Sequence, residues 1–103
     1  MKIIKTLTEM IEDEIDGSEE YIKTAIEVKD HYPNLARVLY EISMQEMNHV
    51  NMLHAEVAKL IEQHKKEKGD PPAAMLAVYD YMHEKHIEEA HEIKMYQAHY
   101  RGE

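Results

Sequence analysis

The 103-residue sequence contains no cysteine, and this absence excludes several chemistries at once. Disulfides, thiolate metal sites, iron–sulfur clusters and cysteine nucleophiles all need that sulfur. Large aromatic side chains are also scarce, because the seven tyrosines are accompanied by no phenylalanine and no tryptophan. Eight methionines take their place. Methionine side chains are flexible, so we expect an adaptable core or subunit interface.

Positive charge is in short supply as well. Twelve Lys and Arg residues stand against 21 Asp and Glu residues, and the formal net charge is −9. Such a surface repels phosphate backbones and anionic lipids, so we expect no nucleic-acid partner and no membrane partner. The uncharged run 71–79 is far shorter than the ~20 apolar residues that a membrane span needs. Charges also interrupt the N-terminal segment too early for a signal peptide, and we expect a cytoplasmic protein.

Glycine and proline are rare, with three of each, and two groups of them divide the chain. At the first break, Pro33 is tolerated in the first turn of a helix but not in its interior. At the second break, Gly69 can close one helix, Asp70 can cap the next, and Pro71 fits the first turn of that next helix. These positions predict three segments joined by short turns.

The residues between these breaks are strong helix formers, with apolar side chains at every third or fourth position. They predict helices over about 3–30, 33–68 and 71–100. Short connections make neighbouring helices antiparallel. We therefore expect an all-α, up-down-up three-helix chain that forms one domain over 1–103.

The informative residues are the polar ones within the apolar stripes, when each residue is placed at 100° per position. On the first helix, Glu14 falls at the centre of the stripe, and its acidic neighbours point elsewhere. The stripe consists of Ile3, Leu7, Met10, Ile11, Tyr21, Ala25 and Val28. On the second helix, Glu46 falls at the centre and His49 lies one turn further on. That stripe consists of Leu35, Leu39, Ile42, Val50, Leu53, Val57 and Leu60.

A carboxylate in an apolar stripe is costly unless it is paired, protonated or bound to a cation. Counted from a reversal near residue 31 or 32, Glu14, Glu46 and His49 agree in height within ~5 Å. Carboxylate oxygens combined with an imidazole nitrogen suit iron, manganese or zinc. We therefore predict that these three residues bind metal. The alternative is a solvated glutamate and an ordinary core histidine.

The segment 14–21, followed by Glu46-Met47-Asn48-His49, resembles the first half of a ferritin-like di-iron protein. Rubrerythrins and bacterioferritins carry a glutamate followed two turns later by a tyrosine, and then a Glu-x-x-His in the next helix. The resemblance covers about residues 5–65. It implies that Glu14 is a terminal ligand, Glu46 a bridging ligand and His49 the nitrogen ligand. It also implies that Tyr21 hydrogen-bonds to a ligand, the alternative being a plain core aromatic.

The ferritin-like family has four helices, in which two helix pairs each contribute a Glu and a Glu-x-x-His. This sequence predicts only one such pair and a third helix. The encapsulated ferritins, a related half-length group, complete their site between two subunits. Two copies of this chain would supply four carboxylates and two imidazoles, whose charge two divalent cations would balance. The resemblance therefore implies a ferritin-like bundle completed by a homodimer or a higher homo-oligomer.

The third predicted helix carries His83 and His86 on its best apolar face. The other members of this face are Leu76, Tyr79, Ile87 and Ala90. By the same count, the two histidines lie ~7 Å along the bundle from the predicted metal site. They are secondary candidates, either as metal ligands or as near-site proton groups. Glu88 and His91 form another Glu-x-x-His, but they point off the apolar face and fit a solvated surface better.

The chemistry that the family implies is oxidation of Fe²⁺ by dioxygen or peroxide, with no catalytic residue beyond the metal ligands. The implied cofactor is dinuclear iron, with manganese and zinc as alternatives. The alternative function is a metal-binding or purely structural oligomeric bundle without turnover.

Overall fold

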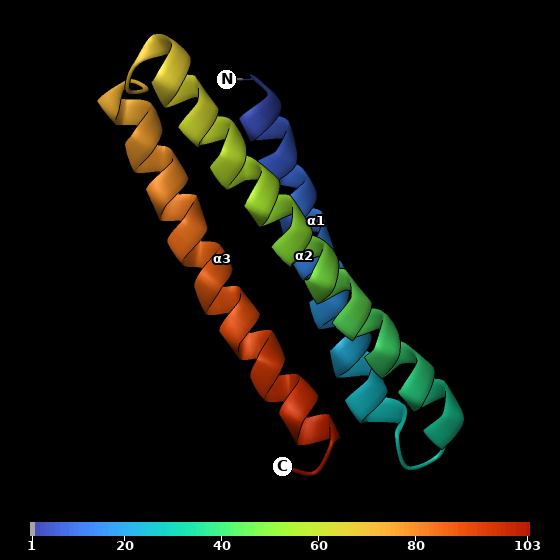
Figure 1. Ribbon diagram of the computed structural model, residues 1–103. Helices are drawn as coiled ribbons and strands as arrows, with labels where there is room; N and C mark the ends of the chain where they lie inside the picture. Colours follow the sequence, from blue (N-terminus) through green and yellow to red (C-terminus); the bar gives the residue numbers. More distant parts are fainter. Residues whose placement is uncertain (1) are drawn as a thin grey trace.

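The computed structural model describes residues 2–103, which form three helices and no strand. Helix α1 spans Lys2–Val28, α2 spans Pro33–Lys68 and α3 spans Ala73–Tyr100. Figure 1 shows three long rods aligned side by side, with the chain reversing its direction at each connection. The molecule measures 56 × 18 × 17 Å. The prediction of an all-α chain with three helices is confirmed. None of the helices within residues 2–103 is long and apolar enough to cross a membrane.

The helix limits follow the proline and glycine positions. Pro33 lies in the first turn of α2, where its missing N–H has no intrahelical partner to lose. Gly69 ends α2 with a φ of 79°, a region that favours glycine. The prediction that Asp70 caps the third helix is wrong, because α3 has Pro72 at its N-cap and begins at Ala73. Each proline disfavours a helical conformation at the preceding residue, which delays the start of this helix.

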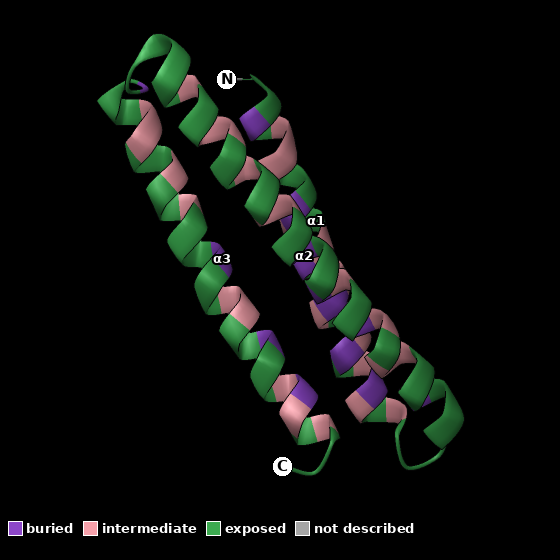
Figure 2. Ribbon diagram, in the orientation of Figure 1, coloured by how far each residue is buried: buried purple, intermediate pink, exposed green. Residues whose placement is uncertain are grey.

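The core lies mainly between α1 and α2, and Ile93 of α3 packs against it. Helix α3 contacts α1 extensively and α2 very little. Figure 2 shows the buried residues along α1 and in the C-terminal half of α3. The buried cluster consists of Ile11, Ile15, Ile22, Ala25, Ala36, Met47, Val50 and Ile93. Three of these residues, Ile11, Ile15 and Ile22, are isoleucines of α1, and burial of such side chains stabilises the fold.

The predicted stripe on α1 is correct only in part, because Ile11 and Ala25 are buried but other members of it are not. Ile3 and Met10 are 52% and 49% exposed, whereas Ile4, Ile15 and Ile22 are fully buried. The physical reason is that α1 carries two adjacent apolar faces, and the one with the isoleucines packs against the other helices. The face that includes Met10 and Glu14 is left at the surface of the chain.

The predicted stripes on the other two helices are correct only in part. On α2, Val50 is buried as expected, but Leu35 is 49% exposed. On α3, His86 is buried and Ile87 is 55% exposed, so that the core face is rotated toward Ile93. The apolar residues of α3 show little helical periodicity. The orientation of this helix therefore depends on contacts with α1 that the sequence pattern does not predict.

A buried polar network joins all three helices. Ser18 Oγ donates to the Ser43 carbonyl oxygen at 2.8 Å, and Ser43 Oγ donates to the Ser18 carbonyl oxygen at 2.9 Å. Gln97 Nε2 of α3 donates to Ser43 Oγ at 3.1 Å. The two small serines let the backbones of α1 and α2 approach closely, and the reciprocal bonds fix the register of the helices.

Candidate functional site

The structure brings together the three residues predicted to bind metal. Glu14 projects from α1, and Glu46 and His49 project from α2. The Nδ1 atom of His49 lies 3.4 Å from Oε2 of Glu14. The carboxylate of Glu46 lies over Gly17, which follows Glu14 by about one turn of α1. The three side chains therefore share one side of the α1–α2 hairpin, at similar heights.

This side of the hairpin is not covered by α3. The side chains of His49 and Glu14 are 53% and 32% exposed, so the expectation that they lie within a buried stripe is wrong for a single chain. Two shallow hollows adjoin the three residues, and no residue of α3 lines either of them. One is lined by Asp13, Glu14, Gly17, Glu20, Tyr21, Thr24, Leu39 and Glu46. The other is lined by Met10, Asp13, Glu14, His49, Met52 and Leu53.

Like charges gather around Glu46. Its pKa is raised above the ordinary value of 4.5, first by partial burial and then by the negative charge of Glu14, while His49 acts in the opposite direction. Glu20 adds a smaller repulsion. A group whose charged form is disfavoured in this way gains from a nearby cation. The hollow is therefore electrostatically suited to a positive ion.

Gly17 makes room for the Glu46 carboxylate. A Cβ atom at position 17 would overlap Oε2 of Glu46 and would lie 3.1 Å from its Cδ. Glycine inside a helix costs ~1 kcal/mol relative to alanine, so its presence in the middle of α1 needs a reason. The close approach of Glu46 supplies one. The sequence signal was an isolated glycine in a helical pattern, which is typical of such approaches.

Sequence reasoning also missed two acidic residues of this site. Asp13 lines both hollows, and Glu20 lines the hollow that contains Glu46. The helical periodicity places both residues beside the stripe that contains Glu14 and not on it, so it does not single them out. Tyr21 is half-buried and lines the same hollow as Glu46. Its hydrogen bond to a ligand stays a prediction.

The histidines of α3 lie elsewhere. His86 is 2% exposed, and its Nε2 is 2.6 Å from Oε2 of Glu12. His83 lies beside His54 of α2, with the ring centroids 5.2 Å apart. Both residues line a cavity between the helices and not the hollows around Glu46. The structure therefore separates them from the three predicted ligands. Glu88 and His91 are exposed and line neither this cavity nor the hollows around Glu46.

A single chain does not complete a metal site. Within residues 2–103, no group of three or more His, Asp or Glu side chains is arranged to hold a metal ion. Glu14, Glu46 and His49 offer two carboxylates and one imidazole, too few for a dinuclear centre. Comparisons of the chain with family models, with curated proteins and with solved structures found no match.

Proposed function

We propose that this chain is a ferritin-like protein in which two copies together form a dinuclear carboxylate–histidine site for iron. The observation that carries the proposal is the placement of Glu14, Glu46 and His49 on the hairpin face that α3 leaves open. A second copy related by a two-fold axis through this face would add the same three donors. The pair would then supply the four carboxylates and two imidazoles of a ferritin-like di-iron bundle.

The residues on this face fit such a centre. The space left by the missing side chain of Gly17, here called the Gly17 cradle, accommodates the Glu46 carboxylate at the surface of α1. The raised pKa of Glu46 favours a cationic partner. Carboxylate oxygens and a neutral imidazole nitrogen are ligands for Fe²⁺, and for Mn²⁺ or Zn²⁺ as alternatives. Two divalent cations would balance the charge of four carboxylates.

Apolar side chains beside the ligands support a protein partner on this face. Met10 and Met52 line the hollow next to His49 and are 49% and 60% exposed. Exposed apolar side chains around a polar site are typical of an interface, and flexible methionines adapt well to a second copy. A homodimer would bury them and complete a bundle of ferritin type.

In this proposal Fe²⁺ is the substrate, and dioxygen or peroxide accepts its electrons to give Fe³⁺. Glu14 and Glu46 neutralise and orient the ions, and His49 contributes a nitrogen donor that favours iron over Mg²⁺. Asp13 and Glu20 extend the negative field around the hollow, which raises the local concentration of cations. No other side chain is needed for the reaction. We place the protein in the cytoplasm, without a nucleic-acid or membrane partner.

Oxygen consumption on addition of Fe²⁺ tests the proposal. We expect the protein to consume oxygen, the Glu46→Ala variant to lose this activity, and the Glu62→Ala variant to keep it, because Glu62 is exposed on α2 away from the hollows around Glu46. Iron binding without oxygen consumption would instead favour the alternative of a non-catalytic metal-binding or structural oligomer. Equal oxygen consumption by both variants would contradict the assigned site.

A further inference from the structure

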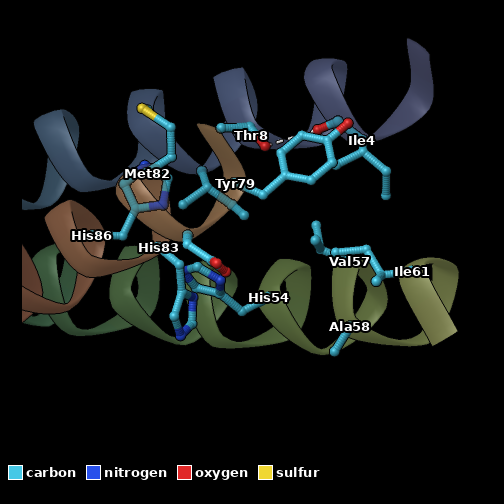
Figure 3. Close-up of a pocket in the computed structure, with 12 residues that line it drawn as sticks. Ile4, Thr8, His54, Val57, Ala58, Ile61, Tyr79, Met82, His83 and His86 are labelled. Carbon is cyan, nitrogen blue, oxygen red and sulfur yellow. Dashed lines mark hydrogen bonds between the residues drawn. The ribbon is translucent and has the colours of Figure 1, made fainter. Parts of the chain in front are cut away.

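A cavity of about 220 Å³ lies between the three helices, away from the open face of the hairpin. Figure 3 shows α1 and α2 on opposite sides of this cavity, with His54 and His83 next to each other at one side. The wall is largely apolar and includes Ile4 and Ile11 of α1, Val57 and Ile61 of α2, and Tyr79 and Met82 of α3. None of the residues around it lines the hollows next to Glu46. The cavity is therefore a separate candidate binding site.

The size and the wall of this cavity suit one aromatic ring. An apolar cavity of ~150 Å³ is large enough to bind benzene, so the volume here admits a single six-membered ring with small substituents. The wall includes the rings of Tyr79, His54 and His83 and the thioether of Met82. Aromatic rings and methionine sulfur both attract another aromatic ring more strongly than burial alone would do.

Two imidazoles supply polar groups on which a ligand can be oriented. The ring centroids of His54 and His83 lie 5.2 Å apart, and the two rings meet edge to face. Among residues 2–103, the histidines whose side chains form hydrogen bonds are His49 and His86. The ring nitrogens of His54 and His83 are therefore open to a ligand. Because a neutral imidazole has one N–H donor and one acceptor nitrogen, a single hydroxyl can donate to one ring and accept from the other.

The groups around the cavity disfavour a charged ligand of either sign. The pKa of His54 is lowered from the ordinary value of 6.5, first by burial and then by the charges of His86 and His83, so a positive charge is unfavourable here. A negative charge is unfavourable as well, because Asp80 lines the cavity and the Glu12 carboxylate lies 2.6 Å from His86. The apolar wall adds a desolvation cost for any ion. The ligand that fits is uncharged.

We propose that this cavity binds a small uncharged phenol, with its ring among the apolar side chains and its hydroxyl between His54 and His83. An apolar cavity with a few convergent polar groups is the usual form of a small-molecule site. The site is independent of the carboxylate face and of the iron function proposed for that face.

Such a ligand would join parts of the molecule that otherwise have few contacts. Helix α3 contacts α2 very little, and the phenol would lie against His54 and Val57 of α2 and against Tyr79 and His83 of α3. Binding would therefore fasten α3 to the hairpin, and the folded protein would become more stable as the ligand concentration rises.

Titration of the metal-free full chain with 4-methylphenol, followed by methyl NMR, tests this site. We expect one ligand per chain with a Kd of about 1 mM or lower. The methyl resonances of Ile4, Val57 and Ile61 should shift, whereas those of Met10 and Met52 on the open face should not. Toluene lacks the hydroxyl and should bind about fivefold more weakly or worse. The charged 4-methylbenzoate should bind at least about tenfold more weakly.

Three variants separate the cavity from other surfaces, and far-ultraviolet circular dichroism checks that each is folded. Val57→Phe fills the cavity with a ring and should weaken binding of 4-methylphenol at least about tenfold. Val78→Phe makes the same change at an exposed position of α3 outside the cavity wall and should leave the affinity unchanged. The His54→Leu/His83→Leu double variant keeps an apolar wall without the nitrogens, so 4-methylphenol and toluene should bind to it within about twofold of each other.

Shifts confined to Met10 and Met52, or the absence of any shift at several millimolar 4-methylphenol, would overturn the proposal. Equal affinity of the Val57→Phe and Val78→Phe variants would overturn it as well. Equal binding of toluene and 4-methylphenol by the parent protein would contradict the role assigned to His54 and His83.

Discussion

His49 Nδ1 and Glu14 Oε2 lie 3.4 Å apart although 35 positions of sequence separate them. The contact exists because α1 and α2 pack along their length, so that residues equally far from the turn come level with each other. Neither residue is buried by α3, and both adjoin the hollow lined by Met10 and Met52. A metal ion bound by both side chains would replace this contact. Loss of the contact would therefore show that an ion occupies the open face.

Removal of the Glu46 carboxylate should abolish stabilisation by Mn²⁺. An ion that binds only the folded protein adds ~4 kcal/mol at a thousandfold excess over its Kd. We expect Mn²⁺ to raise the thermal midpoint of the protein and of Glu62→Ala, but not of Glu46→Ala. Mg²⁺ at equal concentration should leave the midpoint unchanged, since it retains its waters. The metal-free Glu46→Ala variant should be at least as stable as the parent protein, because the substitution removes a repelled carboxylate. A full Mn²⁺ response in Glu46→Ala would argue against the site.

Replacement of Gly17 by alanine should separate stability from metal binding. Alanine stabilises a helix interior by ~1 kcal/mol relative to glycine. Its Cβ would displace the Glu46 carboxylate from the cradle. We expect the metal-free Gly17→Ala variant to match or exceed the parent protein in urea denaturation and to bind Mn²⁺ more weakly. Asp16→Ala, at the neighbouring exposed position, serves as the control and should bind normally. Unchanged Mn²⁺ affinity in Gly17→Ala would show that Glu46 does not need this cradle.

The serine network should behave as one unit. Ser43→Ala removes the acceptor of Gln97 Nε2 and one of the reciprocal bonds to Ser18. A buried polar group left without a partner costs ~1–3 kcal/mol. We expect Ser18→Ala and Ser43→Ala each to destabilise the protein, and the double variant to lose less than the sum of the two. A double-mutant cycle from urea denaturation measures the difference, and strict additivity would contradict the network.

The Glu12 carboxylate should contribute stability that depends on pH. Burial, the largest single effect, raises its pKa, but the hydrogen bonds from Lys85 and His86 together with their charges outweigh burial, and the net pKa is lowered from 4.5. A carboxyl whose pKa is lower in the folded state stabilises the protein above about pH 4.5, and this stabilisation is lost as the pH falls through the folded-state pKa. Glu12→Gln should therefore destabilise the protein by ~1–2 kcal/mol at pH 7.

The difference between Glu12→Gln and the parent protein should shrink at pH 3. Urea denaturation at the two pH values measures it. Glu27→Gln, an exposed change on the same helix, is the control and should have little effect at either pH. A destabilisation by Glu12→Gln that is the same at pH 3 and at pH 7 would contradict this assignment of the ion pairs.

Proline, glycine and helical periodicity were sufficient to predict three helices and the start of α2 at Pro33. Counting from the turn was sufficient to place Glu14 level with His49, since helix rise and hairpin geometry are local properties. The buried face of α1 was not predictable in the same way. Ile4 and Met10 lie on adjacent apolar faces, and the choice between them depends on where α3 packs.

The orientation of α3 is the feature of the fold that the sequence predicts least well. Its apolar side chains do not form one stripe. Ile93 packs into the core, and polar contacts between Glu12 and His86 and between Ser43 and Gln97 also hold the helix in place. Hydrophobic patterning contains no information on such pairs. For that reason the sequence does not predict that His54 lies beside His83 and His86.

Native mass spectrometry of the protein with Fe²⁺, under anaerobic conditions, tests the shared site most directly, because it counts chains and ions in the same particle. We expect the iron-bound species to be a dimer or a multiple of it, with two Fe²⁺ ions per pair of chains that are lost in Glu46→Ala and kept in Glu62→Ala. A monomer that carries two Fe²⁺ ions, or a dimer whose iron content is unaffected by Glu46→Ala, would contradict a centre built from Glu14, Glu46 and His49 of two copies.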